Sequence, residues 1–184
     1  MAAQDRSESG VNRPVLPEAR GSRPDLPVAA KVILIVDDSE DDIISLQQVL
    51  KRAGLTNPIR SVTSGTDAIA YLRGDPPFAD RVKSPMPALI FLDLKMRGLD
   101  GFDVLHWIQI NPDCDKAFLV ALSGLEELSA IRRAYSLGAD TFLVKPCGLA
   151  DVENLLHGFP ACRAILGPPL PPANPGGTAG TRPN

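Results

Sequence analysis

The sequence predicts an α/β domain in which helices cover both faces of a parallel sheet. Short apolar runs, such as residues 32–36 and 88–92, have the length and composition of strands that are buried on both faces. Segments with apolar residues three and four positions apart lie between these runs. A regular alternation of strands and helices requires right-handed crossovers and therefore a doubly wound parallel sheet. The run 88–92 ends on Asp93, and carboxylates at such strand ends lie where α/β sheets bind ligands.

The first half of the predicted domain has two strands and two helices. Asp37 and Asp38 directly follow the strand 32–36, and Ser39 with Asp42 has the S-x-x-D pattern of a helix start. Ile43, Leu46, Leu50 and Ala53 recur at helical spacing, and the helix is expected to stop at Gly54. A strand at 59–62 leads to a second S-x-x-D pattern at Ser64 and Asp67, which opens a helix with Ala68, Tyr71 and Leu72 facing inward.

The second half begins with a proline-rich loop, residues 74–87, whose length is unusual in compact domains and often marks a functional segment. The strand 88–92 follows, and residues 97–101 turn into a helix that bears the apolar residues Phe102, Leu105 and Ile108. The remaining expected elements are a strand at 117–122, a helix at 126–137, a strand at 141–144 and a helix at 149–157. Five such units predict a flavodoxin-like (βα)5 fold with strand order 2-1-3-4-5.

The composition describes one globular domain with flanking segments. The chain has 184 residues, 44% of them hydrophobic, and a formal net charge of -3, which gives no reason to expect a nucleic-acid partner. No apolar run approaches the roughly 20 residues of a membrane-spanning helix, and the N-terminus lacks a secretory signal. Three separated cysteines, Cys114, Cys147 and Cys162, indicate reduced thiols and a cytoplasmic location.

We expect the folded domain at residues 30–160. Residues 1–29 are rich in proline, arginine, serine and glutamate and are predicted to be disordered. The same prediction applies to the proline- and glycine-rich tail, residues 161–184. Either tail can serve as a docking segment or as a solvated extension.

The strand ends bring together a set of polar side chains. The first strand supplies Asp37 and Asp38, the third Asp93, the fourth Ser123 and the fifth Lys145. In a parallel sheet these groups meet at one edge. Clustered carboxylates repel one another unless a cation neutralises them, and oxygen ligands with room for water suit Mg²⁺. Each residue alone has an ordinary structural explanation, but together they predict a carboxylate that accepts a phosphoryl group, with Ser123 and Lys145 binding its oxygens.

Five motifs carry a resemblance to a known family. Val36-Asp37-Asp38, Leu92-Asp93, Leu99-Asp100-Gly101, Ser123-Gly124 and Lys145-Pro146 resemble the receiver domain of two-component response regulators, with 30 positions from Asp93 to Ser123 and 22 from Ser123 to Lys145. The resemblance implies that Asp93 is the phosphoacceptor for a histidine kinase. It also implies that Asp38, Asp93 and the main-chain carbonyl of Lys95 bind Mg²⁺, with Asp37 acting through water.

The resemblance also implies a switch. Ser123 and Phe142 are expected to move inward when Asp93 is phosphorylated, and the Lys145–Pro146 bond is expected to be cis. Three residues depart from the family pattern: Arg97 stands where proline is usual, Lys95 replaces a smaller or neutral residue, and Phe142 lacks the hydroxyl of a tyrosine. Lys95 can reach the edge of the pocket and change the lifetime of the phosphate.

We therefore expect a single-domain response regulator that signals through its fourth helix, fifth strand and fifth helix, by binding a partner protein or forming a homodimer. The stretch 71–74 and the proline-rich loop resemble regulators that pair with phytochrome-type kinases. Transfer to a histidine phosphotransfer protein in a phosphorelay, and a receiver-like module that works without phosphate, are the alternatives. A haloacid dehalogenase-type phosphohydrolase is a third, but its D-x-D motif on the first strand differs from the adjacent Asp37 and Asp38.

Overall fold

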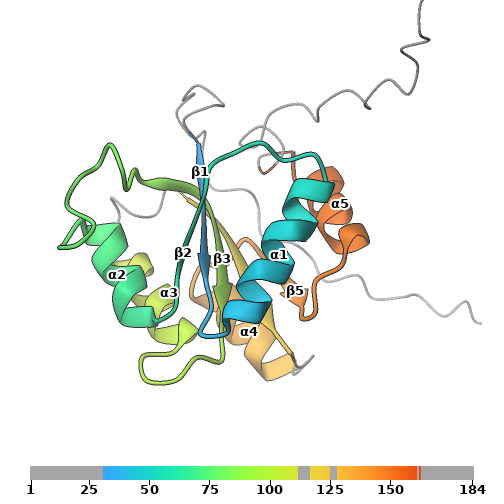
Figure 1. Cartoon of the computed structure of the whole chain (residues 1–184). Helices are drawn as coiled ribbons and strands as arrows, with labels where there is room; N and C mark the ends of the chain where they lie inside the picture. The colour runs from blue at the N-terminus through green and yellow to red at the C-terminus, as the bar shows by residue number, and fades with distance from the viewer. Residues whose placement is uncertain (1–30, 112–116, 125–127, 161, 163–184) are drawn as a thin grey trace, which may run out of the picture.

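The computed structural model describes residues 31–111, 117–124, 128–160 and 162, and its core is a five-stranded parallel sheet (Figure 1). The strands lie in the order β2-β1-β3-β4-β5, so the predicted strand order is confirmed. Their bounds are β1 Val32–Val36, β2 Ile59–Val62, β3 Pro87–Asp93, β4 Phe118–Ser123 and β5 Thr141–Val144. The predictions of disorder for residues 1–29 and 161–184 lie outside the described residues, except at Cys162, which is buried.

In the described part of the chain, five helices cover the two faces of the sheet (Figure 1). One face packs against α1 (Glu40–Arg52) and α5 (Leu149–Gly158), and the other against α2 (Gly65–Arg73), α3 (Gly101–Ile110) and α4 (Leu128–Ser136). This division follows from right-handed crossovers on both sides of β1. In the part of the chain that the structure describes, no helix is both long and apolar enough to cross a membrane.

Polar caps fix where three helices start. The Ser39 hydroxyl accepts a hydrogen bond from the backbone N–H of Asp42, and Ser64 does the same for Asp67, as their spacing predicts. At α3, Asp100 and Asp103 cap one another reciprocally. Because Ser39 comes three residues after β1 ends, its cap starts α1 directly beside the carboxyl edge of the sheet.

The central strands form the dry interior. All five residues of β1 are buried, and so are Leu89 through Asp93 of β3. The predicted inward positions Ile43, Leu46 and Leu50 of α1 are buried against one face, and Ala68, Tyr71 and Leu72 of α2 against the other. Burial of these apolar residues stabilises the sheet by about 25 cal/mol per Å². The two carboxylates at the ends of β1 and β3 are thus held by strands buried in the interior of the sheet.

Small differences separate the expected and observed bounds. The fourth strand begins one residue later than predicted and includes Ser123, and β3 begins at Pro87 rather than at Ala88. The helix expected over residues 126–137 overlaps α4, but residues 125–127 are outside the described part of the chain. These shifts are of the size by which helix and strand ends ordinarily vary.

The proline-rich loop that precedes β3 is packed onto α2. The Arg81 guanidinium donates hydrogen bonds to the carbonyls of Tyr71 and Leu72, which are among the last carbonyls of that helix. The Tyr71 hydroxyl donates to the carbonyl of Pro85, and the rings of Tyr71 and Phe78 lie 5.1 Å apart. The loop therefore caps α2 and connects it to the start of β3.

Candidate functional site

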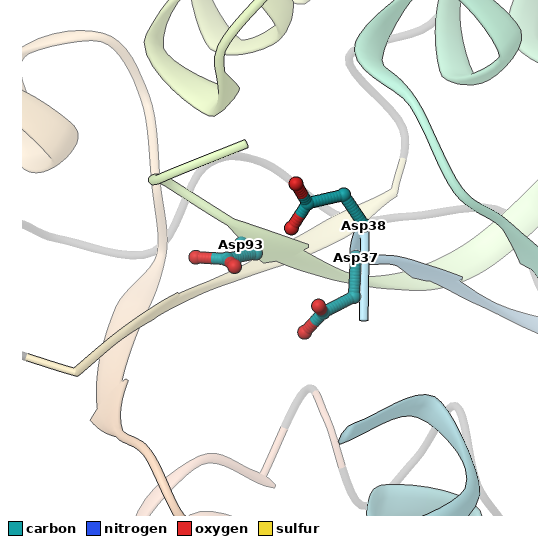
Figure 2. Close-up of side chains that lie close together, drawn as sticks. All are labelled: Asp37, Asp38 and Asp93. Atoms are coloured by element: carbon teal, nitrogen blue, oxygen red, sulfur yellow. The ribbon is translucent and has the colours of Figure 1, made fainter. Parts of the chain in front are cut away.

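Three carboxylates meet at the carboxyl edge of the sheet. Asp37 and Asp38 directly follow β1, and Asp93 is the last residue of the neighbouring strand β3. One carboxylate oxygen from each lies within 4.8 Å of the others (Figure 2). Asp37 and Asp93 are 1% and 5% exposed, so the buried strands hold two negative charges at close range. The expected meeting of the strand ends is present in the structure.

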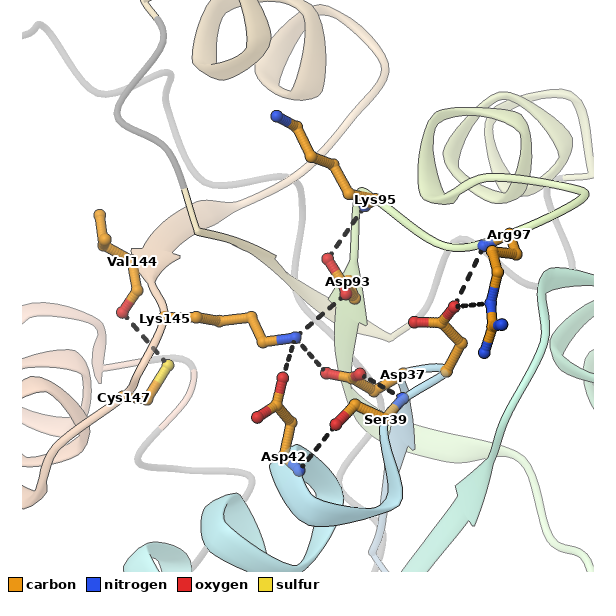
Figure 3. Close-up of polar contacts among 10 residues, drawn as sticks. Asp37, Ser39, Asp42, Asp93, Lys95, Arg97, Val144, Lys145 and Cys147 are labelled. Atoms are coloured by element: carbon orange, nitrogen blue, oxygen red, sulfur yellow. Dashed lines mark hydrogen bonds and ion pairs between the residues drawn. The ribbon is translucent and has the colours of Figure 1, made fainter.

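Lys145, one residue after β5, lies among these acids (Figure 3). Its Nζ is 2.8 Å from Oδ2 of Asp37, 3.1 Å from Oδ2 of Asp93 and 2.6 Å from Oδ2 of Asp42. We call this group, Lys145 with Asp37, Asp42 and Asp93, the lysine cluster. One ammonium thus forms ion pairs with carboxylates at the end of β1, on α1 and at the end of β3.

The charges of the lysine cluster are strongly coupled. Burial alone lowers the pKa of Lys145, but its hydrogen bonds with Asp37, Asp42 and Asp93 outweigh burial and raise that pKa above the ordinary value. Burial raises the pKa of Asp37, and the hydrogen bond from Lys145 offsets only part of this effect. Lys145 is therefore held as a permanent cation.

Asp38 has a different counter-charge. Its Oδ2 accepts hydrogen bonds from the backbone N–H of Arg97 at 3.3 Å and from the Arg97 Nε at 3.1 Å. We call this pair the arginine contact. The backbone hydrogen bond from Arg97 and the adjacent guanidinium hold the pKa of Asp38 below its ordinary value, against a smaller effect of burial. Asp38 is therefore ionised, and its carboxylate contacts the turn that follows β3.

Backbone groups orient the two buried acids. The N–H of Ser39 donates to Oδ1 of Asp37, and the N–H of Lys95 donates to Oδ1 of Asp93 at 2.9 Å. Gly101, the first residue of α3, lies so close to β3 that a Cβ there would collide with the carbonyl oxygen of Asp93. The close approach of α3 requires a glycine and holds the end of β3 in place.

The other predicted residues occupy defined places. Ser123 is the buried last residue of β4, and its carbonyl accepts a hydrogen bond from the N–H of Lys145. Phe142 is partly buried and packs on the face covered by α2, α3 and α4. The Lys145–Pro146 bond is cis. The Lys95 side chain is exposed and points away from Asp93 (Figure 3).

Comparisons with known proteins agree with this geometry. The sequence matches the family described as the response regulator receiver domain over residues 33–157. This chain belongs to that family. The receiver domain is 32% identical to the response regulator Rcp1 of Synechocystis sp. over 129 residues, which are 70% of this chain and 86% of Rcp1.

Solved structures of phytochrome response regulators have the same fold. RPA3017, from red light signaling of R. palustris, is 33% identical, with a TM-score of 0.64, over 70% of this chain and 93% of its own. The Mn²⁺-bound form of Rcp1 is 29% identical with a TM-score of 0.61, over 76% of this chain and 98% of its own. The phosphorylated cyanobacterial phytochrome response regulator RcpA is 29% identical with a TM-score of 0.60, over 70% and 89%. The receiver domain is thus similar to stand-alone regulators of the phytochrome type.

Two residues of the pocket have contacts that the sequence does not predict. Asp42 is predicted only as part of a helix cap, yet it makes the shortest ion pair with Lys145, 103 positions away. Arg97 is noted only as a departure from a family pattern, yet it contacts Asp38, 59 positions away. The S-x-x-D pattern gives the one available signal, because it fixes Asp42 on the first turn of α1, beside the strand ends.

The residues of this pocket fit a divalent cation. Among the described residues, four carboxylates, Asp37, Asp38, Asp42 and Asp93, face the cations of Lys145 and Arg97, and these six ionised side chains have a formal charge of -2. The donors near the triad are oxygens, with no histidine or cysteine among the three clustered residues. Such oxygen-rich, anionic sites suit Mg²⁺ or Mn²⁺ rather than zinc or copper.

Proposed function

We propose that this receiver domain, residues 30–160, accepts a phosphoryl group on Asp93 from a sensor histidine kinase and switches a partner-binding face. One observation carries the proposal: Asp93 is a carboxylate at a rigid strand end, within 4.8 Å of Asp37 and Asp38 and 3.1 Å from the Lys145 ammonium. The proposed nucleophile, Asp93, therefore lies close to a pair of acids that can bind a metal ion. It also lies close to a cation that can bind phosphoryl oxygens.

In the proposed reaction a carboxylate oxygen of Asp93 attacks the phosphorus of a phosphohistidine. The O–P bond forms, the P–N bond breaks, and the imidazole of the kinase leaves and takes up a proton. The Lys95 N–H holds Oδ1 of Asp93, so Oδ2, on the side of Lys145, is the oxygen we assign as nucleophile. Lys145 then transfers its hydrogen bond from Asp93 to the phosphoryl oxygens, where its positive charge stabilises the negative charge of the transferring group.

Asp38, Asp93 and the main-chain carbonyl of Lys95 would hold Mg²⁺ directly, and Asp37 would act through water. When bound, the ion would neutralise charge on the transferring phosphoryl group. The formal charge of -2 in the ionised pocket supports this ligand set, as does the Mn²⁺-bound form of the relative Rcp1.

The proposed switch links Asp93 to the edge strand β5 and the helices beside it. Ser123 would donate its hydroxyl hydrogen to a phosphoryl oxygen, and Phe142 would turn further into the core. Because β4 and β5 pair through Ser123 and Val144, these movements would alter the surface made by α4, β5 and α5. That surface would bind a downstream protein or a second copy of the chain.

The similarity to Rcp1, RPA3017 and RcpA supports a phytochrome-type kinase as the donor. Such a role would place the protein in the cytoplasm, in keeping with the free thiol of Cys147. A phosphorelay intermediate would differ in passing the phosphoryl group to a histidine phosphotransfer protein. A phosphorylation-independent module would bind its partner equally well with and without a beryllofluoride mimic of the phosphate.

The test is phosphotransfer from autophosphorylated histidine kinases, phytochrome-type kinases included, to the wild type, Asp93→Asn and Asp41→Asn. Asp41 is the matched control, since it is an exposed acid on α1 beside the pocket. We expect label on the wild type and Asp41→Asn in Mg²⁺, and none on Asp93→Asn or in a chelator. Label on Asp93→Asn at the wild-type level would make the assignment of the phosphoacceptor wrong.

A further inference from the structure

We propose that Arg97 competes with Mg²⁺ for Asp38 and thereby sets the metal affinity of the pocket. The inference rests on the proposed function only in taking Mg²⁺ as the ion. It concerns a residue outside the predicted ligand set, and it follows from the arginine contact.

The arginine contact uses the ligand atom itself. Both donors of Arg97, the backbone N–H and the Nε, bind the same oxygen, Oδ2 of Asp38. A divalent cation that binds this oxygen competes with both hydrogen bonds for its lone pairs. A cation that binds the other oxygen of Asp38 would still lie beside a guanidinium and be repelled by it. In either case Arg97 weakens metal binding.

The exposure of the two side chains makes this competition reversible. The Arg97 side chain is 92% exposed, whereas that of Lys145 is 17% exposed. An exposed ion pair costs little to break, and the released guanidinium regains its hydration in solvent. Arg97 can therefore leave when the metal binds and return when the metal leaves. Lys145 cannot leave the pocket in this way, because three carboxylates hold it there.

The two donors can be removed separately. Arg97→Gln removes the positive charge and the Nε but keeps the backbone N–H. Arg97→Pro removes both donors, since proline has no N–H. Arg52→Gln is the matched control, because Arg52 is an exposed arginine at the far end of α1 and its replacement changes the net charge equally.

The experiment is a calorimetric titration of the full chain with MgCl₂, with folding checked by circular dichroism. We expect Arg97→Gln to bind Mg²⁺ about two- to fivefold more tightly than the wild type at low ionic strength. Arg97→Pro is expected to bind at least as tightly as Arg97→Gln, and Arg52→Gln to bind as the wild type does. The gain in Arg97→Gln should shrink at high NaCl, because salt screens an exposed charge.

Asp38→Asn tests whether Asp38 carries the effect. In that background the additional change Arg97→Gln should raise the Mg²⁺ affinity by less than it does in the wild type, since the carboxylate that holds the guanidinium beside the metal is gone. Equal affinities of the wild type and Arg97→Gln, or an equal gain in Arg52→Gln, would overturn the inference and leave the proposed function standing. A wild-type chain that binds no Mg²⁺ would instead contradict the proposed function itself.

Discussion

The lysine cluster and the arginine contact neutralise the same pocket in different ways. Lys145 lies 2.6–3.1 Å from three carboxylates and directly follows β5, an edge strand of the sheet. Arg97 touches one carboxylate and lies on the exposed turn after β3. Both are basic residues opposite acids, but the first is largely removed from solvent and the second is not.

The difference separates a structural charge from an exchangeable one. A cation buried among acids cannot leave without exposing unpaired buried charge, which costs several kcal/mol. A cation on the surface leaves at a cost of about 1 kcal/mol or less. The buried carboxylate of Asp93 is thus paired with a cation that stays in the pocket, while the more exposed carboxylate of Asp38 is paired with one that can leave.

The largest expected effect that tests this contrast is on folding stability. Lys145→Ala leaves Asp37 buried without its counter-charge and should lower the free energy of unfolding by about 3 kcal/mol in a chelator. Arg97→Ala should lower it by less than about 1 kcal/mol. Urea denaturation of both variants measures the difference, and equal losses would remove the distinction between the two contacts.

The pH dependence of that loss follows from the raised pKa of Lys145. A cation whose pKa is raised by folding contributes its full stabilisation below its unfolded pKa and loses it as the pH rises through the folded value. The stability difference between the wild type and Lys145→Ala attributable to this shift should hold from neutral pH to about pH 9. It should fall only above the ordinary lysine pKa of 10.5.

Cys147 reports whether the surroundings of Lys145 are dry. It lines the same cavity as Lys145, Asp37 and Asp42, and burial, with Asp151 nearby, raises the pKa of its thiol to about 11 from 9.0. The thiolate fraction near neutral pH, and with it the alkylation rate, should be about a hundredfold below that of an ordinary cysteine. Mass spectrometry of iodoacetamide-treated protein measures this rate, and a rate equal to that of a free peptide would indicate a wet pocket.

Gly101 tests whether the end of β3 must stay fixed for the lysine cluster to form. Gly101→Ala would place a Cβ 2.7 Å from the Cα of Leu94 and against the carbonyl oxygen of Asp93. We expect a loss of about 2 kcal/mol in unfolding free energy. Gly158→Ala, with no atom near its added Cβ, is the control and should be close to neutral. A neutral Gly101→Ala would mean that α3 can move away from β3 freely.

Replacing Asp42 has the smallest expected effect. The exposure of the Asp42 side chain lies between that of Lys145 and that of Arg97. Its side chain is 46% exposed, although its ion pair with Lys145 is the shortest in the lysine cluster. Asp42→Asn should cost about 0.5 kcal/mol more than Asp41→Asn, which removes an acid from the same helical turn. Thermal denaturation compares the pair. A loss as large as that of Lys145→Ala would place Asp42 with the buried acids.

The sequence predicts the fold and the composition of the pocket better than the contacts within it. The runs at β1 and β3 and the caps at Ser39 and Ser64 are local signals, and a parallel sheet brings its strand ends together whatever the side chains are. The partners of Asp38 and Asp42 depend instead on side chains that meet across 59 and 103 positions. Burial, which separates Lys145 from Arg97, likewise appears only after the chain folds.

The central claim is that this pocket is built around Asp93 as its single phosphoacceptor. Treating the full chain with acetyl phosphate, with and without Mg²⁺, and mapping the modified peptide by mass spectrometry tests the claim most directly. We predict one phosphoryl group per chain, on the peptide that contains Asp93, and only when Mg²⁺ is present. A phosphoryl group on the peptide of Asp37 and Asp38, or equal modification in a chelator, would contradict the account.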